Sequence, residues 1–289
     1  MTITISNQSI TAKISTHGAE LISFQSEGIE FIWQADPEYW EWHSPILFPF
    51  IGRLKDNQYT YKGKNYSMPK HGFIRDCQFD ILAMTNELVI LTFSSNSETR
   101  KLYPFDFTLN VKYEIWGEGL RVHFNLKNTG EEKMIFALGS HPAFNVPLED
   151  HLTFDDYYFS FLPSKCRTTI PLEEHFVNFD KRTLGQTNTY IGLCHDLFSN
   201  SSLIYETKGL NAFMIESEKS IHDITLVYKN FPYVALWSPY PNEANFVCIE
   251  PWYGMIDTTT STGKLEDLLG MNHLASNERF ETEYSIIIH

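Results

Sequence analysis

The sequence predicts an all-β fold, a large antiparallel β-sandwich with very little helix. Over most of the 289 residues, polar and apolar side chains alternate with a period of two, the pattern of half-buried strands. Short runs of this kind recur about fifteen or more times between turn residues, which is typical of a sandwich or barrel. Aromatic residues, which strands favour, make up 15% of the chain. No linker, repeat or low-complexity tract interrupts the pattern, so we expect a single domain over residues 1–289.

Four pairs of runs predict β-hairpins, because a short polar or glycine-containing turn separates the two members of each pair. The pairs are Ile3–Ile5 with Ile10–Ile14, Leu21–Phe24 with Ile29–Trp33, Tyr59–Tyr61 with Asn65–Ser67, and Phe107–Ile115 with Leu120–Leu126. Ten further runs predict strands near 79–84, 88–94, 133–138, 152–161, 203–206, 212–216, 223–229, 233–237, 245–249 and 280–288.

Helical signals are few. Asp36 followed by Pro37 resembles a helix start, with aspartate as the cap and proline in the first turn, so a short helix is expected over Asp36–Trp40. A second segment, Gly263–Leu269, is long enough for one or two helical turns. The segment 162–200 is the least regular and is expected to form long loops over a sheet.

Composition excludes several classes of protein. The chain has 22 basic and 36 acidic residues, a net charge of −14, which disfavours nucleic acid and anionic membrane surfaces as partners. It contains no run of about 18 apolar residues that would span a membrane, and its first residues do not resemble a signal peptide, so a cytoplasmic location is expected. The four cysteines are far apart in the sequence, which predicts reduced thiols and no cysteine-ligated metal. Neither a metal nor an organic cofactor is expected.

Two clusters in the first quarter of the chain contain candidate binding residues. Arg53 ends the apolar run Pro45–Ile51, and its five donors suit vicinal hydroxyls or a carboxylate. His71 precedes a glycine that permits a tight turn or the close approach of a ligand. A structural role stays open for each, an internal ion pair for Arg53 and a bond to a backbone carbonyl for His71.

Two later clusters contain candidate acid–base residues. Pro142 restricts the backbone of His141, and a rigidly held imidazole is a good general acid near neutral pH. Glu250 ends an apolar run, where burial raises the pKa of a carboxyl and makes it a usable base. Structural roles stay open here too, a structural histidine at 141 and a loop cap at 250. The signatures of P-loop proteins, dinucleotide-binding folds, zinc proteases and serine hydrolases are absent.

Taken together, these segments resemble the aldose 1-epimerase (mutarotase) family, in its LacX-like branch. The matching stretches are PILFPFIGRLKDNQYTYKGKNYSMPKHGFIRD, LGSHPAFNVP, HDLF and CIEPWYGMID, in this order along nearly the whole chain. The resemblance implies a galactose mutarotase-like β-sandwich and an isomerase that interconverts the α and β anomers of a free hexose without a cofactor.

The resemblance also implies roles for individual residues. His141 matches the general acid of the family and Glu250 its general base. Arg53 and His71 match its substrate-binding arginine and histidine, and Asp196 of HDLF matches, less closely, an acidic residue that binds sugar hydroxyls.

Sugar chemistry adds two aromatic candidates and leaves three alternatives open. Trp237 and Trp252 are expected to line the cleft, because indole rings stack on sugar faces. Glycoside hydrolysis would need two carboxyl groups, whereas these clusters offer a single outstanding one, Glu250. A non-catalytic sugar-binding or sensor protein would use the same fold. A hexose-6-phosphate mutarotase would need several cations at the cleft, for which Arg53, Lys70 and Arg75 are available.

Overall fold

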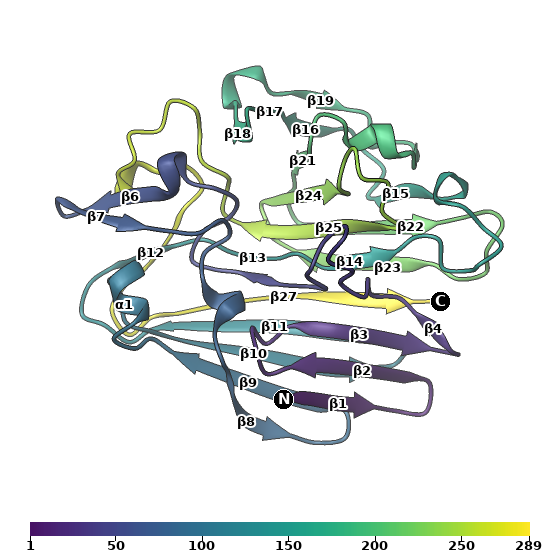
Figure 1. Cartoon of the computed structure of the whole chain (residues 1–289), viewed down its shortest axis with the longest axis horizontal. Helices are drawn as coiled ribbons and strands as arrows, with labels where there is room; N and C mark the ends of the chain where they lie inside the picture. Colours follow the sequence, from purple (N-terminus) through teal and green to yellow (C-terminus); the bar gives the residue numbers. More distant parts are fainter.

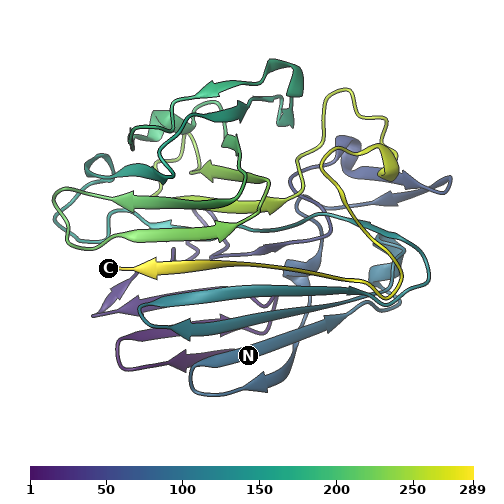
Figure 2. The ribbon, with the colours of Figure 1, turned by 180° about the vertical axis from the view of Figure 1, so that it is seen from behind.

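The computed structural model describes residues 1–289 as two layers of antiparallel β-sheet. One layer is a nine-stranded sheet, which forms the back of the molecule in Figure 1 and the near side in Figure 2. In sheet order its strands are β20 (Ile191–Gly192), β15 (Tyr158–Leu162), β22 (Leu210–Glu216), β23 (Ile224–Lys229), β27 (Arg279–Ile288), β11 (Gly119–Asn128), β10 (Phe107–Trp116), β9 (Leu88–Ser94) and β8 (Asp80–Met84).

Two sheets form the facing layer (Figure 1). The smaller contains β1 (Thr2–Ser6), β2 (Ile10–Ser15), β3 (Leu21–Ser26) and β4 (Ile29–Glu30). The larger has eight strands, and its main path runs β19 (Thr183–Gly185), β16 (Arg167–Ile170), β21 (Leu203–Glu206), β24 (Tyr233–Trp237), β25 (Phe246–Tyr253), β13 (Leu138–Ser140) and β5 (Ile46–Leu47), with β14 (Ala143–Asn145) also paired to β25. All ladders between these strands are antiparallel, which confirms the predicted fold class.

The main core lies between the two layers, and the alternation in the sequence explains it. Along β10 every second residue, from Phe107 to Ile115, is buried. Strand β25 differs because all but its last residue are buried, on both faces of the sheet. Val247 and Ile249 point into the main core, whereas Phe246, Cys248 and Trp252 pack in two smaller clusters on the other face. That outer face of the eight-stranded sheet therefore has its own cover, built from loops.

The four predicted hairpins are confirmed, as β1–β2, β3–β4, β6 (Gln58–Tyr61) with β7 (Lys64–Ser67), and β10–β11. The predicted strand at 152–161 begins late, because Phe154–Asp156 form a 3₁₀ turn closed by a capping box between Thr153 and Asp156. The expected helix over Asp36–Trp40 is wrong. It amounts to one turn, in which the carbonyl of Asp36 accepts from the N–H groups of Tyr39 and Trp40.

The other expected helix, over Gly263–Leu269, is a single 3₁₀ turn at Leu265–Asp267. The short helix α1 (Thr99–Leu102) was not expected from the sequence. The segment 162–200 is mostly loop with short strands, as predicted, and includes the hairpin of β17 (Leu172–Glu173) and β18 (Phe176–Val177). None of the helices has the length and apolar character that crossing a membrane requires.

Candidate active site

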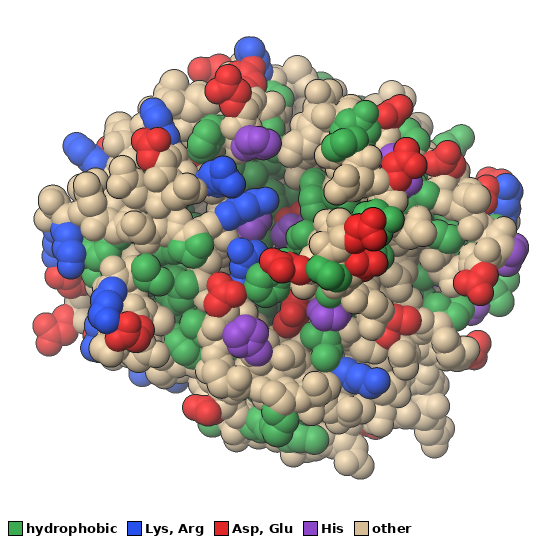
Figure 3. All heavy atoms as spheres, in the orientation of Figure 1, with side chains coloured by type: hydrophobic (Ala, Val, Ile, Leu, Met, Phe, Trp, Pro, Cys, Tyr) green, Lys and Arg blue, Asp and Glu red, His purple; other side chains and the backbone are tan.

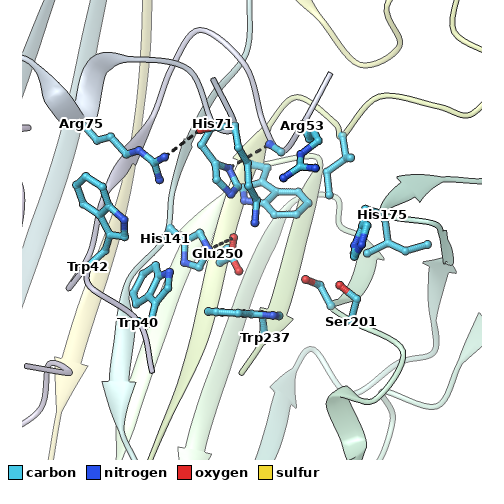
Figure 4. A pocket seen from close by; sticks show the side chains of 16 residues that line it. Trp40, Trp42, Arg53, His71, Arg75, His141, His175, Ser201, Trp237 and Glu250 are labelled. Carbon is cyan, nitrogen blue, oxygen red and sulfur yellow. Dashed lines mark hydrogen bonds and ion pairs between the residues drawn. The ribbon is translucent and has the colours of Figure 1, made fainter. Parts of the chain in front are cut away.

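A cavity of about 330 Å³ opens on the outer face of the eight-stranded sheet. Figure 3 shows it as a hollow near the centre of that face, with histidine inside and lysine or arginine beside it. This volume lies within the usual range for small-molecule sites, roughly 300–1,000 Å³. Six of the seven site residues predicted from the sequence line this cavity: Arg53, His71, His141, Trp237, Glu250 and Trp252. Figure 4 shows how the labelled side chains among them face it. They come from segments nearly 200 residues apart in the sequence.

The register of β25 against its neighbours brings His141 and Glu250 together. Gly139 of β13 pairs with Trp252, and Ala143 of β14 pairs with Cys248, in one continuous register. Continuing that register across the break between β13 and β14 places His141 opposite Glu250. The imidazole Nε2 lies 3.2 Å from the carboxylate Oε2 (Figure 4). Directly opposite residues of an antiparallel pair lie on the same face of a sheet, so both side chains face the cavity.

Burial sets the protonation of this pair. The side chains of Glu250 and His141 are only 2% and 7% exposed. Burial raises the pKa of Glu250 well above 4.5, while the charge of Lys70 and the indole N–H of Trp252 act to lower it. Burial, followed by the charge of Lys70, lowers the pKa of His141 well below 6.5. Over the pH range between these two titrations, the pair holds a single proton.

Two tryptophans fix the orientation of the His141 ring. Trp40 stacks on it, with centroids 4.8 Å apart and planes at 29°, and Trp237 meets it edge-on at 5.6 Å. The indole N–H of Trp33 donates to the carbonyl of Trp40 at 2.9 Å and anchors that segment. Imidazole therefore has little rotational freedom, and its Nε2 stays directed at Glu250.

His71 lies on a loop that interlocks with the loop before Arg53. The N–H of His71 donates to the carbonyl of Gly52 at 2.7 Å, and the N–H of Gly52 donates to Nδ1 of His71 at 3.0 Å. An Nδ1 that accepts a hydrogen bond leaves the ring proton on Nε2 in the neutral imidazole. Burial lowers the pKa of His71 well below 6.5. His71 thus offers the cavity a neutral N–H donor.

Gly72 is needed for this interlock, which gives a first prediction. Its φ is +76°, and an added Cβ would overlap the carbonyl oxygen of Phe48. We expect Gly72→Ala to lower the free energy of unfolding by more than about 2 kcal/mol, because left-handed strain and a backbone clash add. Gly63→Ala is the matched control, since Gly63 has a similar φ of +74° and nothing within 4 Å of the added Cβ. It should cost only about 1–2 kcal/mol. Urea unfolding measures the free energy of unfolding of both variants. An equal loss of stability in the two would contradict the proposed interlock.

Arg53 follows Gly52 and projects to the cavity with an exposed side chain. It takes part in none of the ion pairs of the chain, so the structural alternative of an internal ion pair does not hold. Its guanidinium donors are free for a ligand.

Two of the expected binding residues are placed differently. Asp196 does not line the cavity; it is exposed on the 3₁₀ turn His195–Phe198, where its charge and a hydrogen bond raise the pKa of Tyr240. Trp252 lines the cavity but is only 1% exposed, so it has no free ring face for stacking on a sugar. Trp237, expected at the cleft, does line it and is half-buried.

Several lining residues gave no clear signal in the sequence. His175 sits in the two-residue turn between β17 and β18, where Glu174 and His175 have φ of 50° and 75°. This is the conformation that Asn-Gly favours, and a Glu-His pair does not predict it. Ser201, with φ of 74°, lines the same side of the cavity as His175 (Figure 4). Trp40 and Trp42 were also missed.

Cys248 adds a third possible metal ligand beside the acid–base pair. Its sulfur and the ligand atoms of His141 and Glu250 all lie within 4.8 Å of one another. Metal binding requires the thiolate, whereas burial and the charge of Glu250 raise the pKa of Cys248 well above 9.0. The three residues therefore do not fit a metal well, and their arrangement suits proton transfer instead.

Comparisons with known proteins identify the family and agree with the fold. The sequence profile of the family described as aldose 1-epimerase matches residues 1–265. A galactose mutarotase related enzyme from Lactobacillus acidophilus superposes with a TM-score of 0.98 at 40% identity, over 100% of this chain and 97% of that one. A galactose mutarotase-like protein from Lactobacillus casei gives a TM-score of 0.92 at 33% identity, over the full length of both.

A further relative is matched by its sequence alone. Protein LacX of Lactococcus lactis is 29% identical over 299 aligned positions, covering 100% of this chain and 99% of the relative. The profile match covers far more than half of the chain, and two of these relatives align along essentially their whole length. The chain belongs to the aldose 1-epimerase family.

Proposed function

We propose that this protein is a mutarotase, which interconverts the α and β anomers of a hexose that has a free anomeric hydroxyl. The observation that carries the proposal is the buried contact of His141 with Glu250 on the floor of the cavity. The remaining lining residues supply hydrogen-bond donors and aromatic surface, which suit a sugar. No step of the reaction calls for a redox change or for attack by a nucleophile.

The chemistry requires one proton acceptor and one proton donor near the same carbon. A base removes the proton of the hydroxyl on C1, and an acid protonates the ring oxygen, so the C1–O5 bond breaks and an aldehyde forms. Rotation about the C1–C2 bond and reclosure on the other face of the carbonyl give the other anomer. Because both reacting oxygens are bonded to C1, the two groups must lie close together, and His141 and Glu250 are 3.2 Å apart.

A pair with a single proton serves both halves of the reaction. In the family-based assignment Glu250 is the base and His141 the acid, which requires the proton on His141. Burial favours the neutral form of the pair, with the proton on Glu250. Both forms have the same net charge, and a proton passes between them across one contact. The group that donates during ring opening accepts again during ring closure, so the pair is restored after each turnover.

Arg53 and His71 would hold the open-chain aldehyde while it rotates. His71 presents an N–H donor and Arg53 a free guanidinium to the cavity. Fixing the intermediate in one site keeps its reacting atoms near the pair and prevents its escape.

Replacing Arg53 tests this binding role. We expect Arg53→Ala to lower kcat/KM roughly 10- to 100-fold, mainly through KM, because hydrogen bonds to a charged group are worth about 1.5–3 kcal/mol. The melting temperature should stay unchanged, because Arg53 is exposed and has no partner in the protein. A large fall in the melting temperature together with unchanged KM would show that Arg53 is structural.

A glycosidase is less compatible with this cavity. Hydrolysis needs two carboxyl groups, about 5–5.5 Å or 6.5–9.5 Å apart, whereas Glu250 is the only carboxylate among the lining residues. A protein that only binds sugar has no need of a buried pair that shares a proton.

Polarimetry of freshly dissolved α-glucose and α-galactose tests the proposal. The approach to equilibrium should accelerate in proportion to enzyme concentration. Sugar binding by calorimetry without any acceleration would make the protein a binding module instead.

A further inference from the structure

The charge of the cavity is opposite to that of the protein. The chain as a whole has 22 lysines and arginines against 36 acidic residues. The cavity is lined by Arg53, Lys70 and Arg75 against a single acid, Glu250. Figure 3 shows lysine or arginine side chains beside the hollow, with acidic side chains near it and over the rest of this face. Like charges gathered in an acidic protein repel one another, so this grouping needs an explanation.

The three cations differ in how free they are. Arg75 is tethered, because its Nη2 donates to the carbonyl of Lys70 at 3.1 Å and its guanidinium lies 4.5 Å from the ring centroid of Trp42. Desolvation lowers the pKa of Arg75, and the nearby charges of Asp76, Glu41 and Glu20 raise it.

Arg53 and Lys70 are free. Both are exposed at the cavity, and neither takes part in an ion pair. Desolvation lowers the pKa of Lys70, the charge of Glu250 raises it, and the charges of Arg75 and Arg53 lower it, so Lys70 lies among the other charges of the cavity. Two cations that repel each other and make no ion pair within the protein form a site for an anion.

The donors and acceptors of the cavity lead to the same conclusion. A neutral sugar presents hydroxyls, each of which donates as well as accepts, and so needs acceptors around it. The cavity offers fewer acceptors than donors: Arg53, Lys70 and Nε2 of His71 only donate, the hydroxyls of Ser201 and Ser202 donate or accept, and the one carboxylate is engaged with His141. A phosphate group presents several acceptor oxygens and matches such a rim. Arg53, His175 and Ser201 border the same side of the cavity, away from His141 (Figure 4).

We propose that the preferred substrate is an aldose with a phosphate monoester remote from C1, and that Arg53 and Lys70 bind the phosphate. This inference rests on the mutarotase function proposed above. The phosphate must be remote from C1, because ring opening requires a free hydroxyl there. With C1 held on the cavity floor by His141 and Glu250, the phosphate lies toward the mouth, where the two cations are exposed.

The test is anomer exchange measured by NMR, with glucose, glucose 6-phosphate and glucuronate as substrates. We expect kcat/KM for glucose 6-phosphate to exceed that for glucose by about 100-fold, roughly tenfold for each charge-assisted hydrogen bond. Lys70→Gln should lower this ratio by about tenfold. Lys64→Gln is the matched control, because it removes the same charge from an exposed position outside the cavity, and it should leave the ratio unchanged. Added salt should reduce the preference in the wild type.

Three results would overturn the phosphate site: equal efficiency with glucose, a preference for glucuronate, or an unchanged ratio in Lys70→Gln. Calorimetric titration with glucose and with glucose 6-phosphate separates this inference from the proposed function. Selective binding of the phosphate without anomer exchange would support the anion site and refute the mutarotase. Anomer exchange with glucose but no preference for glucose 6-phosphate would support the mutarotase and refute the anion site.

Discussion

Glu250→Gln should lower kcat by roughly 10²–10⁴, the usual contribution of a positioned acid or base. Glutamine keeps the shape of the side chain and its hydrogen-bonding reach, but it cannot take up or release the proton that ring opening requires. Substrate binding should survive, because Arg53 and His71 are unaffected. Anomer exchange by NMR gives the rate, and calorimetry gives the affinity.

The stability of this variant is an internal control. Glu250 is 2% exposed, and burial favours its neutral acid form, so a neutral amide of the same shape should leave the free energy of unfolding nearly unchanged. Glu243→Gln is the matched control for charge, since Glu243 is exposed just before β25 and does not line the cavity. It should keep full activity. Wild-type turnover in Glu250→Gln would remove this residue from the mechanism.

His141→Asn should cause a loss of similar size, roughly 10²–10⁴ in kcat, because the pair then lacks its second proton-transfer group. The pH dependence of kcat shows whether this loss comes from the missing proton-transfer group. In the wild type, activity needs the form of the pair with one proton. As pH falls, a second proton binds to the pair and activity is lost. This acidic limb lies below pH 6.5, because burial lowers the pKa of His141. As pH rises, the last proton leaves the pair and activity is lost again. This basic limb lies above pH 4.5, because burial raises the pKa of Glu250.

The wild-type profile is therefore a bell, whose two limbs belong to the coupled pair. In His141→Asn the residual activity should follow a single titration, that of Glu250. A variant that retains the bell at near wild-type turnover would show that another group is the acid. Thermal melts of the same preparations exclude unfolding as the explanation of a loss.

Much of the fold follows from local sequence. The hairpins were predictable because each has a polar or glycine-containing turn between two alternating runs, as at Ser6–Ile10. The errors arose where a side chain hydrogen-bonds to backbone N–H groups and so favours a turn over the expected strand or helix. Thr153 and Asp156 cap a 3₁₀ turn and delay β15, and Asp36 caps a turn that does not continue as a helix.

The site is a product of long-range register, which is why the sequence predicted its members better than their arrangement. Glu250 and His141 stood out because each is a polar residue in an apolar run. Their contact depends on β13 and β14 keeping one register on β25 across Pro142, which no local pattern reveals. His175 and Ser201 reach the cavity through left-handed turns on loops whose course depends on the sheet beneath.

The measurement that tests the central claim most directly is the rate of anomer exchange, by NMR, of the wild type and of the double variant His141→Asn/Glu250→Gln. Groups that act as one unit are far from additive, so the double variant should lose about as much as either single variant, roughly 10²–10⁴ in kcat. Its melting temperature should match that of the singles. A double variant as fast as the wild type, or a wild type no faster than buffer toward every aldose and aldose phosphate, would contradict the account.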